Sequence, residues 1–490
     1  MVQENTEKKV TFNIDKNENF SEWFTEICSK AELADIRYDV KGMVVFQSWS
    51  VFAMEKMYDF MEKTLQAKGH EPVWFPALIP EKNFKLEEEH VKGFAEQIFW
   101  VTESGLEKLE EKLGLRPTSE TAFYQMYALW IRSYNDLPFK KYQRANVFRY
   151  GTDATRPFLR SREFHWIEAH CAFATQAQAE KQVRQDMQTT IEVLTNIYGI
   201  PLIFFKRPQW DKFPGAQDTF AADCFAPSGR VVQQPSTHLL SQNFSKPFNV
   251  KYTDKNGKEK NCYTTCYGPA ISRIFGSVIA THGDNKGLIF PFEIAPKQVV
   301  IVPIMWGKES DEKVIKKANS LYKQLNKKFD CTIDLTDKRM GEKFYYWEMK
   351  GVPIRIELGE KELNENKVTL FRRDTGEKIK IDFKLLKKEI QRIGKDISRN
   401  LREKANKEFE SNIVKVNSFD ELKTAIANKK IAKADFCSIE LTGEPCSLKI
   451  KEATSATVRG LRMDKEEKAS GNCVICGKKA ELVTYIAKQY

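Results

Sequence analysis

Among the arginines of the segment 142–170, which reads YQRANVFRYGTDATRPFLRSREFHWIEAH, four lie close together between aromatic residues: Arg149, Arg156, Arg160 and Arg162. Arginine keeps its charge at any working pH and presents a planar fork of donors, so it suits phosphate and carboxylate groups. Residues 147–150 and 164–166 are predicted to form an antiparallel strand pair, with turn residues at 151–153. The segment is interpreted as a nucleotide clamp. The alternative is a basic surface hairpin that binds nothing.

Two side-chain hydroxyls and one carboxylate precede the helical pattern at 122–130. They belong to Thr118, Ser119 and Glu120. Held at a helix start, these side chains could bind an ammonium group. The alternative is an ordinary helix N-cap, with Glu120 in the first turn, where the helix dipole favours a negative charge.

Arg273 stands at the head of an apolar helical pattern at 275–280. A buried arginine is costly unless an anion meets it, so a phosphate ligand would explain this residue. An internal carboxylate partner would explain it equally well.

Four of the ten cysteines lie near the C-terminus: Cys437, Cys446, Cys473 and Cys476. The last two form Cys-Val-Ile-Cys followed by Gly477, a knuckle turn whose NH groups can face two thiolates. Together the four match the closed tetrahedral Cys₄ set of a structural zinc site. The alternative is four unrelated thiols. Cys262 and Cys266 have no second pair nearby and are predicted to pack in the core.

The composition is that of a multidomain protein with a moderate basic excess. At 490 residues the chain is expected to hold roughly three domains. Its net charge of +11 is compatible with a polyanionic partner without proving one. Because the N-terminus lacks a signal peptide and no apolar run is long enough for a bilayer, we expect a cytoplasmic protein without a membrane partner. No P-loop or GxGxxG motif is present, so an ATP site must be of another kind.

Hydrophobic periodicity predicts the order of the elements. Helices are expected at 50–66, 176–198, 311–328 and 385–409, and strands at 73–76, 200–205, 299–302 and 353–358. Alternating strands and helices between 299 and 383 predict a separate α/β domain. Residues 1–19 are predicted to be a flexible tail.

Taken together, the chain resembles the archaeal/eukaryotic-type prolyl-tRNA synthetases, which are class II aminoacyl-tRNA synthetases. The resemblance runs from about residue 20 to the end. It rests on the helix and strand ending at Pro76, Thr118-Ser119-Glu120, Val147-Phe148-Arg149 with Arg156-Pro157, Trp210-Asp211-Lys212-Phe213, Gly268 to Arg273, His282-Gly283-Asp284, Gly351-Val352-Pro353, the C-terminal cysteines and Tyr490.

The resemblance implies a multidomain fold of α/β and α+β parts. A class II catalytic domain built on an antiparallel sheet would span 20–296, and an α/β anticodon-binding domain would span 297–400. A small α+β zinc-binding module would span 401–490. The helix before Pro76 would lie at a homodimer interface.

The resemblance also implies ATP-dependent attachment of L-proline to tRNA(Pro) through prolyl-adenylate, with Mg²⁺ accompanying ATP and a structural Zn²⁺ on the four cysteines. The implied ATP-binding residues are Arg149, Arg160, Ser161, Gln233, Ser236 and Arg273. The implied proline-binding residues are Thr118, Glu120, Arg149 and His238. Arg149 would hold the α-phosphate and the proline carboxylate, and Arg273 the γ-phosphate, which makes these two the catalytic pair.

One residue departs from the family pattern at a position that matters for ATP. Gly151 stands where motif 2 usually has a glutamate that contacts the adenine amino group. This keeps open a tRNA-binding or regulatory paralogue without aminoacylation activity. A synthetase for another amino acid of the same subclass is a further alternative.

Overall fold

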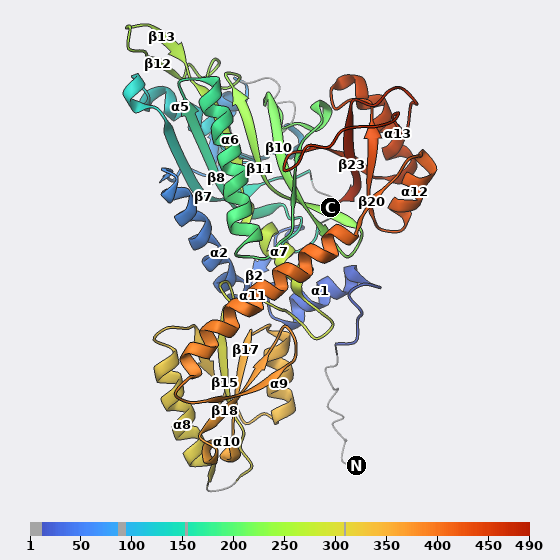
Figure 1. Cartoon of the computed structure of the whole chain (residues 1–490). Helices are drawn as coiled ribbons and strands as arrows, with labels where there is room; N and C mark the ends of the chain where they lie inside the picture. The colour runs from blue at the N-terminus through green and yellow to red at the C-terminus, as the bar shows by residue number, and fades with distance from the viewer. Residues whose placement is uncertain (1–11, 87–94, 152–154, 308–309) are drawn as a thin grey trace. The chain divides into compact units, whose positions relative to one another are not determined.

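The computed structural model describes residues 12–86, 95–151, 155–307 and 310–490 (Figure 1). These residues form two compact units. Unit 1 contains the chain up to Leu33 together with His282–Ile397, and unit 2 contains Ala34–Thr281 together with Ser398–Tyr490.

Unit 2 is built on one large sheet, in which the described strands follow the order β20-β21-β23-β22-β9-β10-β11-β14-β8-β7-β3. From β9 to β7 every neighbouring pair is antiparallel. The strands are β3 (Glu71–Pro72), β7 (Phe139–Phe148), β8 (Glu163–Phe173), β9 (Ile203–Lys206), β10 (Asp218–Ala226), β11 (Arg230–Ser241), β14 (Tyr263–Gly268), β20 (Ile413–Lys415), β21 (Ile431–Phe436), β22 (Thr457–Arg462) and β23 (Leu482–Gln489). The predicted antiparallel catalytic sheet is confirmed.

Smaller elements surround this sheet. They are the short strands β1 (Ala34–Asp35), β2 (Val45–Phe46), β4 (Leu78–Pro80), β5 (Phe99–Ser104), β6 (Glu107–Leu115), β12 (Lys251–Thr253) and β13 (Glu259–Asn261), and the helix α3 (Glu81–Phe84). The longer helices are α2 (Ser48–Ala67), α5 (Glu120–Trp130), α6 (Gln176–Thr190) and α7 (Ile271–His282). In Figure 1, α6 lies along the sheet face, where it contacts β8, β11 and β14.

The predicted helix at 50–66 is confirmed by α2, whose methionine stripe (Met54, Met57 and Met61) is buried. The predicted helix at 176–198 is shorter than expected. It leaves α geometry after Thr190 and continues as a π-helix over Ile191–Thr195. The hydroxyls of Thr189 and Thr190 donate to the carbonyls four residues earlier, at 2.8 and 3.1 Å. Such back-bonding competes with the regular helical ladder and bends helices.

The predicted strand at 73–76 is wrong. The strand β3 covers Glu71–Pro72 and pairs in parallel with β7. Beyond it, Val73 makes one bond from its N–H to the carbonyl of Tyr142, at 2.8 Å, and Trp74 is 88% exposed. Proline has no N–H to donate to a ladder, so Pro72 and Pro76 restrict the pairing to a short piece.

The C-terminal region is not a separate lobe, because its strands extend the catalytic sheet. Leu461 of β22 pairs with Lys206 of β9, and Lys488 of β23 pairs in parallel with Arg230 of β11. Two helices, α12 (Phe419–Ala427) and α13 (Glu444–Thr454), cover this end of the sheet. The sequence indicated a C-terminal α+β module but no strand pairing with the catalytic domain.

Unit 1 is a mixed α/β layer, which confirms the predicted α/β domain. Its strands follow the order β16-β15-β17-β18-β19, in which β16, β15 and β17 are parallel. The elements are α1 (Phe20–Lys30), β15 (Val299–Pro303), α8 (Ser310–Leu325), β16 (Cys331–Ile333), α9 (Met340–Met349), β17 (Ile354–Leu358), α10 (Glu360–Asn364), β18 (Lys367–Arg372) and β19 (Lys378–Asp382). The long helix α11 (Leu386–Ser411) begins in unit 1 and ends in unit 2.

Part of the predicted flexible tail packs within unit 1. Phe12 is buried and donates its N–H to the Tyr345 hydroxyl at 3.2 Å, and the Lys16 ammonium donates to the Gly283 carbonyl at 2.6 Å. The rest of the predicted tail, residues 1–11, lies outside the described residues.

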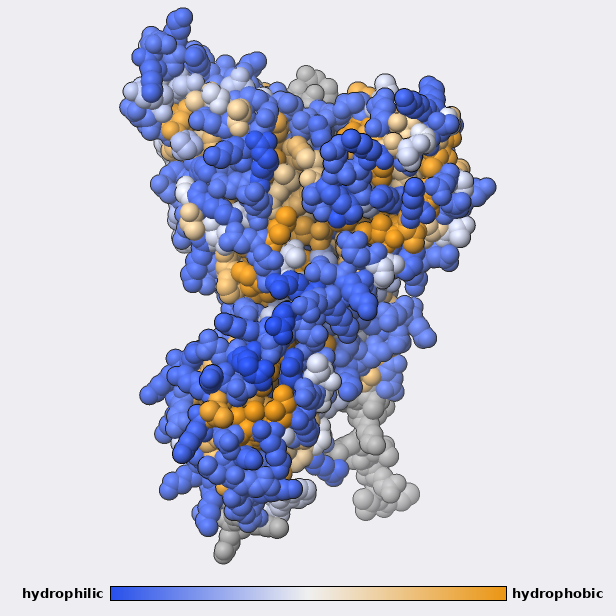
Figure 2. All heavy atoms as spheres, in the orientation of Figure 1, coloured by the Kyte–Doolittle hydropathy of each residue, from blue (hydrophilic) through white to orange (hydrophobic). Residues whose placement is uncertain are grey.

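The surface is mainly hydrophilic on the face shown in Figure 2, with smaller hydrophobic areas between hydrophilic residues. Within the described ranges, no helix combines the length and the apolar content that a bilayer crossing requires.

Candidate active site

Two adjoining cavities open on the sheet of unit 2. The first, of about 250 Å³, is lined by Thr118, Glu120 and Glu168 among others and is called the carboxylate cavity. The second, of about 270 Å³, is lined by Arg160, Ser161 and Tyr490 among others and is called the arginine cavity. Both are also lined by Arg149, Phe164, Gln233, Arg273 and Gln489, which therefore mark their boundary.

The structure brings together every residue predicted for the ATP and proline sites. Thr118, Glu120, Ser236 and His238 line the carboxylate cavity, Arg160 and Ser161 line the arginine cavity, and Arg149, Gln233 and Arg273 line both. Two further arginines of the 142–170 segment lie over tyrosine rings instead: Arg156 is 5.9 Å from the Tyr490 ring and Arg162 is 4.4 Å from the Tyr150 ring.

The hydroxyls before α5 bind carboxylates. Ser119 occupies the N-cap position, but it makes no side-chain cap bond. Its hydroxyl lies 2.5 Å from Oε2 of Glu168 and its N–H donates to Oε1 at 3.0 Å. Thr118 Oγ1 lies 2.5 Å from Oε2 of Glu120 and 3.0 Å from Oε1 of Glu168. Ser119 and Glu120 thus occupy the predicted N-cap and first-turn positions, but the Ser119 hydroxyl binds Glu168 and does not cap the helix, so a buried pair of carboxylates is held in the cavity wall.

This carboxylate pair has the electrostatics of a cation site. Burial, and then the neighbouring Glu168, raise the pKa of Glu120 to about 7. Two carboxylates that share one site resist simultaneous ionisation, and an arriving cation relieves that repulsion. A ligand with an ammonium group would therefore bind here with strong charge complementarity.

Arg149 follows β7 and is held in one orientation. Its Nε donates to the Pro117 carbonyl at 2.9 Å, and its guanidinium lies 5.3 Å from the Phe164 ring and 5.5 Å from the Trp166 ring. Burial lowers its pKa, against the opposing pull of Glu120 and Glu168. The guanidinium fork therefore lies beside the carboxylates and at the boundary of both cavities.

Arg273 lies in the first turn of α7. Burial, and then the positive charges of Arg149 and Arg160, lower the pKa of Arg273 to about 10. Among the described residues it makes no ion pair with a carboxylate, which favours an external anion over an internal partner. Three guanidinium groups that repel one another around a cavity form a binding site for a polyanion such as a triphosphate.

His238 closes the carboxylate cavity as a neutral group. Its Nδ1 lies 2.9 Å from Thr219 Oγ1, its Nε2 lies 3.0 Å from Ser236 Oγ, and the Phe213 ring lies 4.5 Å away. Burial, and then Arg149, lower the pKa of His238 to about 3. The segment 210–213, which the resemblance singled out, contributes Asp211, Lys212 and Phe213 to this cavity.

Sequence reasoning missed Glu168, Gln489 and the cavity role of Cys266. Trp166, Glu168 and His170 alternate along β8 and line the same cavity, so a period of two could have revealed Glu168. Cys266 packs in the core as predicted but also lines the carboxylate cavity. No local sequence pattern marked Gln489 as a site residue. It reaches the cavities only because β23 pairs with β11, which is distant in the sequence.

The four C-terminal cysteines meet in space. The Sγ atoms of Cys437, Cys446, Cys473 and Cys476 all lie within 4.8 Å of one another. The turn between the last two closes with a bond from the Gly477 N–H to the Cys473 carbonyl, at 2.9 Å. Zinc–thiolate bonds of about 2.3 Å place tetrahedral sulfurs about 3.8 Å apart, so this donor set fits a zinc ion.

Three protein-family models match successive segments of the chain. A model of the "tRNA synthetase class II core domain (G, H, P, S and T)" matches residues 99–282. An "Anticodon binding domain" model matches 298–393, and a "Prolyl-tRNA synthetase, C-terminal" model matches 419–490.

Curated relatives and solved structures match nearly the whole chain. A proline--tRNA ligase of Thermofilum pendens is 46% identical over 97% of this chain and 98% of its own length, and one of Methanopyrus kandleri is 41% identical over 96% of each. The structure of Giardia lamblia prolyl-tRNA synthetase in complex with prolyl-adenylate has a TM-score of 0.95 at 38% identity, covering 98% of this chain and 100% of that one. The chain therefore belongs to the family of prolyl-tRNA synthetases, the class II synthetases named proline--tRNA ligases.

Proposed function

We propose that, in this proline--tRNA ligase, the carboxylate cavity binds L-proline and the arginine cavity binds the phosphates of ATP. A proline carboxylate oxygen attacks the α-phosphorus of ATP, which forms prolyl-adenylate and releases pyrophosphate. A hydroxyl of the terminal adenosine of tRNA(Pro) then attacks the prolyl carbonyl carbon and releases AMP. The observation that carries this proposal is the position of Arg149, which lines both cavities and lies next to the carboxylate pair.

Proline is recognised by charge and by shape. Its imino group, an NH₂⁺ with two donors, is held by Glu120 and Glu168 with help from the Thr118 hydroxyl. Because His238 stays neutral, it closes the pocket without repelling this cation. The Phe213 ring beside His238 provides an apolar surface for the pyrrolidine ring.

ATP is held by positive charge placed where negative charge develops. Arg149 stabilises the α-phosphate and Arg273 the γ-phosphate, while Arg160, Ser161, Gln233 and Ser236 contact the rest of the nucleotide. Fixed donors of this kind stabilise the transferring group without reorganising during the reaction. Among its described lining residues the arginine cavity has no carboxylate. Mg²⁺ would therefore be held by phosphate oxygens and water, a common arrangement for this ion.

The activity is tested by proline-dependent ATP–pyrophosphate exchange with the purified chain. Exchange with proline, and not with threonine, serine or glycine, is expected. If no exchange occurred at saturating proline and ATP, the ligase assignment would fail and the tRNA-binding paralogue would be favoured.

Gly151 is expected to weaken the contact with the adenine. A Cβ at this position would meet the flexible Gln97 side chain, with Cγ at 3.1 Å, so a larger residue requires only a small movement. Gly151→Glu restores an acceptor for the adenine amino group and is expected to lower KM for ATP several-fold, as one additional hydrogen bond would. KM for proline should not change. Gly151→Gln is a matched control for the charge, and an unaltered KM for ATP in both variants would count against the lost contact.

Zinc on the four cysteines is proposed to be structural, because four protein ligands leave no open position. One zinc ion per chain is expected by metal analysis. Cys473→Ser should lose it and lower the unfolding temperature by several degrees. Cys262→Ser, which alters a buried thiol outside the cluster, should keep the metal. A metal-free parent as stable as Cys473→Ser would contradict the zinc site.

We also propose the functional division of the chain: a catalytic domain at 20–296, an anticodon-binding domain at 297–400 that reads tRNA(Pro), and a zinc-binding module at 401–490. A homodimer would use the face around α2. Exposed apolar side chains of α2 include Phe52, which is 56% exposed.

A further inference from the structure

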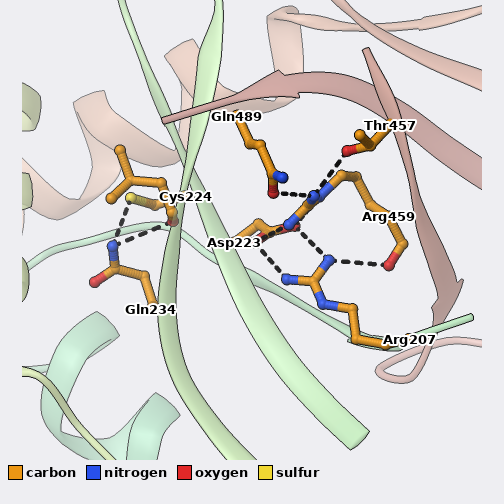
Figure 3. Close-up of polar contacts among 8 residues, drawn as sticks. Arg207, Asp223, Cys224, Gln234, Thr457, Arg459 and Gln489 are labelled. Carbon is orange, nitrogen blue, oxygen red and sulfur yellow. Dashed lines mark hydrogen bonds and ion pairs between the residues drawn. The ribbon is translucent and has the colours of Figure 1, made fainter. Parts of the chain in front are cut away.

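A buried charge cluster joins the C-terminal strands to the floor of the catalytic site (Figure 3). Asp223 of β10 accepts from Arg207 at 2.7 and 3.0 Å and from Arg459 of β22 at 2.8 and 3.1 Å. All three side chains are at most 2% exposed. Burial alone would raise the pKa of Asp223, but the two guanidinium groups outweigh it and lower the value to about 2.

The cluster has one positive charge in excess, so its spare donors need further acceptors. Arg207 Nη1 also donates to the Arg459 carbonyl at 3.0 Å. Arg459 Nη1 donates to Thr457 Oγ1 at 3.0 Å and to Gln489 Oε1 at 2.6 Å. Buried donors without partners are costly, so these bonds hold the cluster in one arrangement.

The hydrogen bond from Arg459 to Gln489 Oε1 determines which end of the Gln489 amide is left to bind a ligand. A guanidinium only donates, so Gln489 must present its oxygen to Arg459, which leaves the two N–H donors of Nε2 for another acceptor. Gln489 lines both cavities at the boundary that it shares with Arg149 and Arg273.

The backbone at Gln489 is also tied in place. Its carbonyl accepts from Arg230 Nη1 at 2.8 Å, and the next N–H, that of Tyr490, donates to the Val231 carbonyl at 3.1 Å. With the backbone held by β11 and the oxygen held by Arg459, the amide nitrogen has little freedom of direction.

We propose that Gln489 is a further nucleotide-binding residue, whose Nε2 donates to a phosphate oxygen of ATP, and that Arg459 is its positioning residue. The proposal rests on the proposed placement of ATP at the arginine cavity. A purely structural role for the cluster is the alternative. Stability alone does not explain the cluster, because buried ion pairs contribute little net stability compared with apolar packing. The strand pairing of β22 with β9 could hold these elements together without it.

Two substitutions and their combination separate the alternatives. Gln489→Ala changes an exposed side chain and is expected to raise KM for ATP about tenfold in the exchange reaction, with KM for proline within twofold. Arg459→Lys keeps a positive charge near Asp223 but loses the fork that reaches Gln489, so it should raise KM for ATP several-fold. Because Arg459 acts through Gln489, the double variant should match Gln489→Ala alone.

A matched control lies on the same strand. Arg462 of β22 binds Asp464 and the Tyr485 hydroxyl and does not line either described cavity, so Arg462→Lys should leave both KM values unchanged. An unchanged KM for ATP in Gln489→Ala would overturn the proposal, as would effects that multiply in the double variant. If Arg273→Ala also left KM for ATP unchanged, the placement of ATP itself would be at fault.

Discussion

Replacing Glu120 by glutamine is expected to raise KM for proline at least a hundredfold, while KM for ATP stays within about twofold. The side chain keeps its shape but loses the charge that faces the imino group. Removing one partner of a buried charge pair costs about 3 kcal/mol or more, which corresponds to about a hundredfold in affinity. The change should be measured by exchange at saturating ATP.

The pH dependence gives a second readout of the same substitution. The pKa of Glu120 is raised to about 7, so the ionised form that binds the cation is lost as the pH falls below that value. In the parent, KM for proline should therefore rise as the pH is lowered from 8 to 6. In Glu120→Gln this rise should flatten, because the titrating group is absent. A parent profile that is flat across this range would contradict the assignment.

Asp186 provides the matched control for Glu120. It is a buried carboxyl whose pKa burial also raises to about 7, but it lies on α6 and does not line either described cavity. Asp186→Asn is expected to change stability and to leave KM for proline unaltered. If KM for proline rose equally in both variants, the effect of Glu120→Gln would come from disturbed folding and not from a lost contact with proline.

Replacing Arg149 by lysine is expected to lower kcat for exchange by a hundred- to a thousandfold. Lysine keeps the charge but loses the planar fork that would bridge the α-phosphate and the proline carboxylate. Loss of one well-placed donor to a developing charge commonly costs about 10² to 10³ in kcat. The Pro117 carbonyl would also lose its donor, so unfolding should be followed in parallel.

Arg144 is the matched control for Arg149, because it lies on β7, the strand that Arg149 directly follows, and also stacks on an aromatic ring. Its guanidinium lies 3.7 Å from the Tyr58 ring and forms an ion pair with Glu55, outside both described cavities. Arg144→Lys is expected to keep exchange within about twofold. If Arg149→Lys also retained exchange within tenfold, Arg149 would not be the residue that bridges the two substrates.

The local parts of this protein could be predicted from residue types and their spacing. The stripe of α2, the strand pair β7 and β8, and the α/β character of unit 1 follow from apolar periodicity, which acts over neighbouring residues. The same holds for the chemical types at the site, since Thr118, Glu120, Arg149 and Arg273 were identifiable as charged or hydroxyl groups at element ends.

Which of these groups lie in contact depends on the folding of distant segments against one another. Ser119 is the N-cap residue of α5, but its side chain makes no cap bond because Glu168, 49 residues further along the chain, accepts from its hydroxyl and N–H. Gln489 reaches the cavities because β23 pairs with β11, and Arg459 meets Asp223 across a separation of 236 residues. Local patterns specify which face of an element is buried, but the register between distant strands depends on the packing of the whole sheet. That packing places the C-terminal strand beside the arginines near which ATP is proposed to bind.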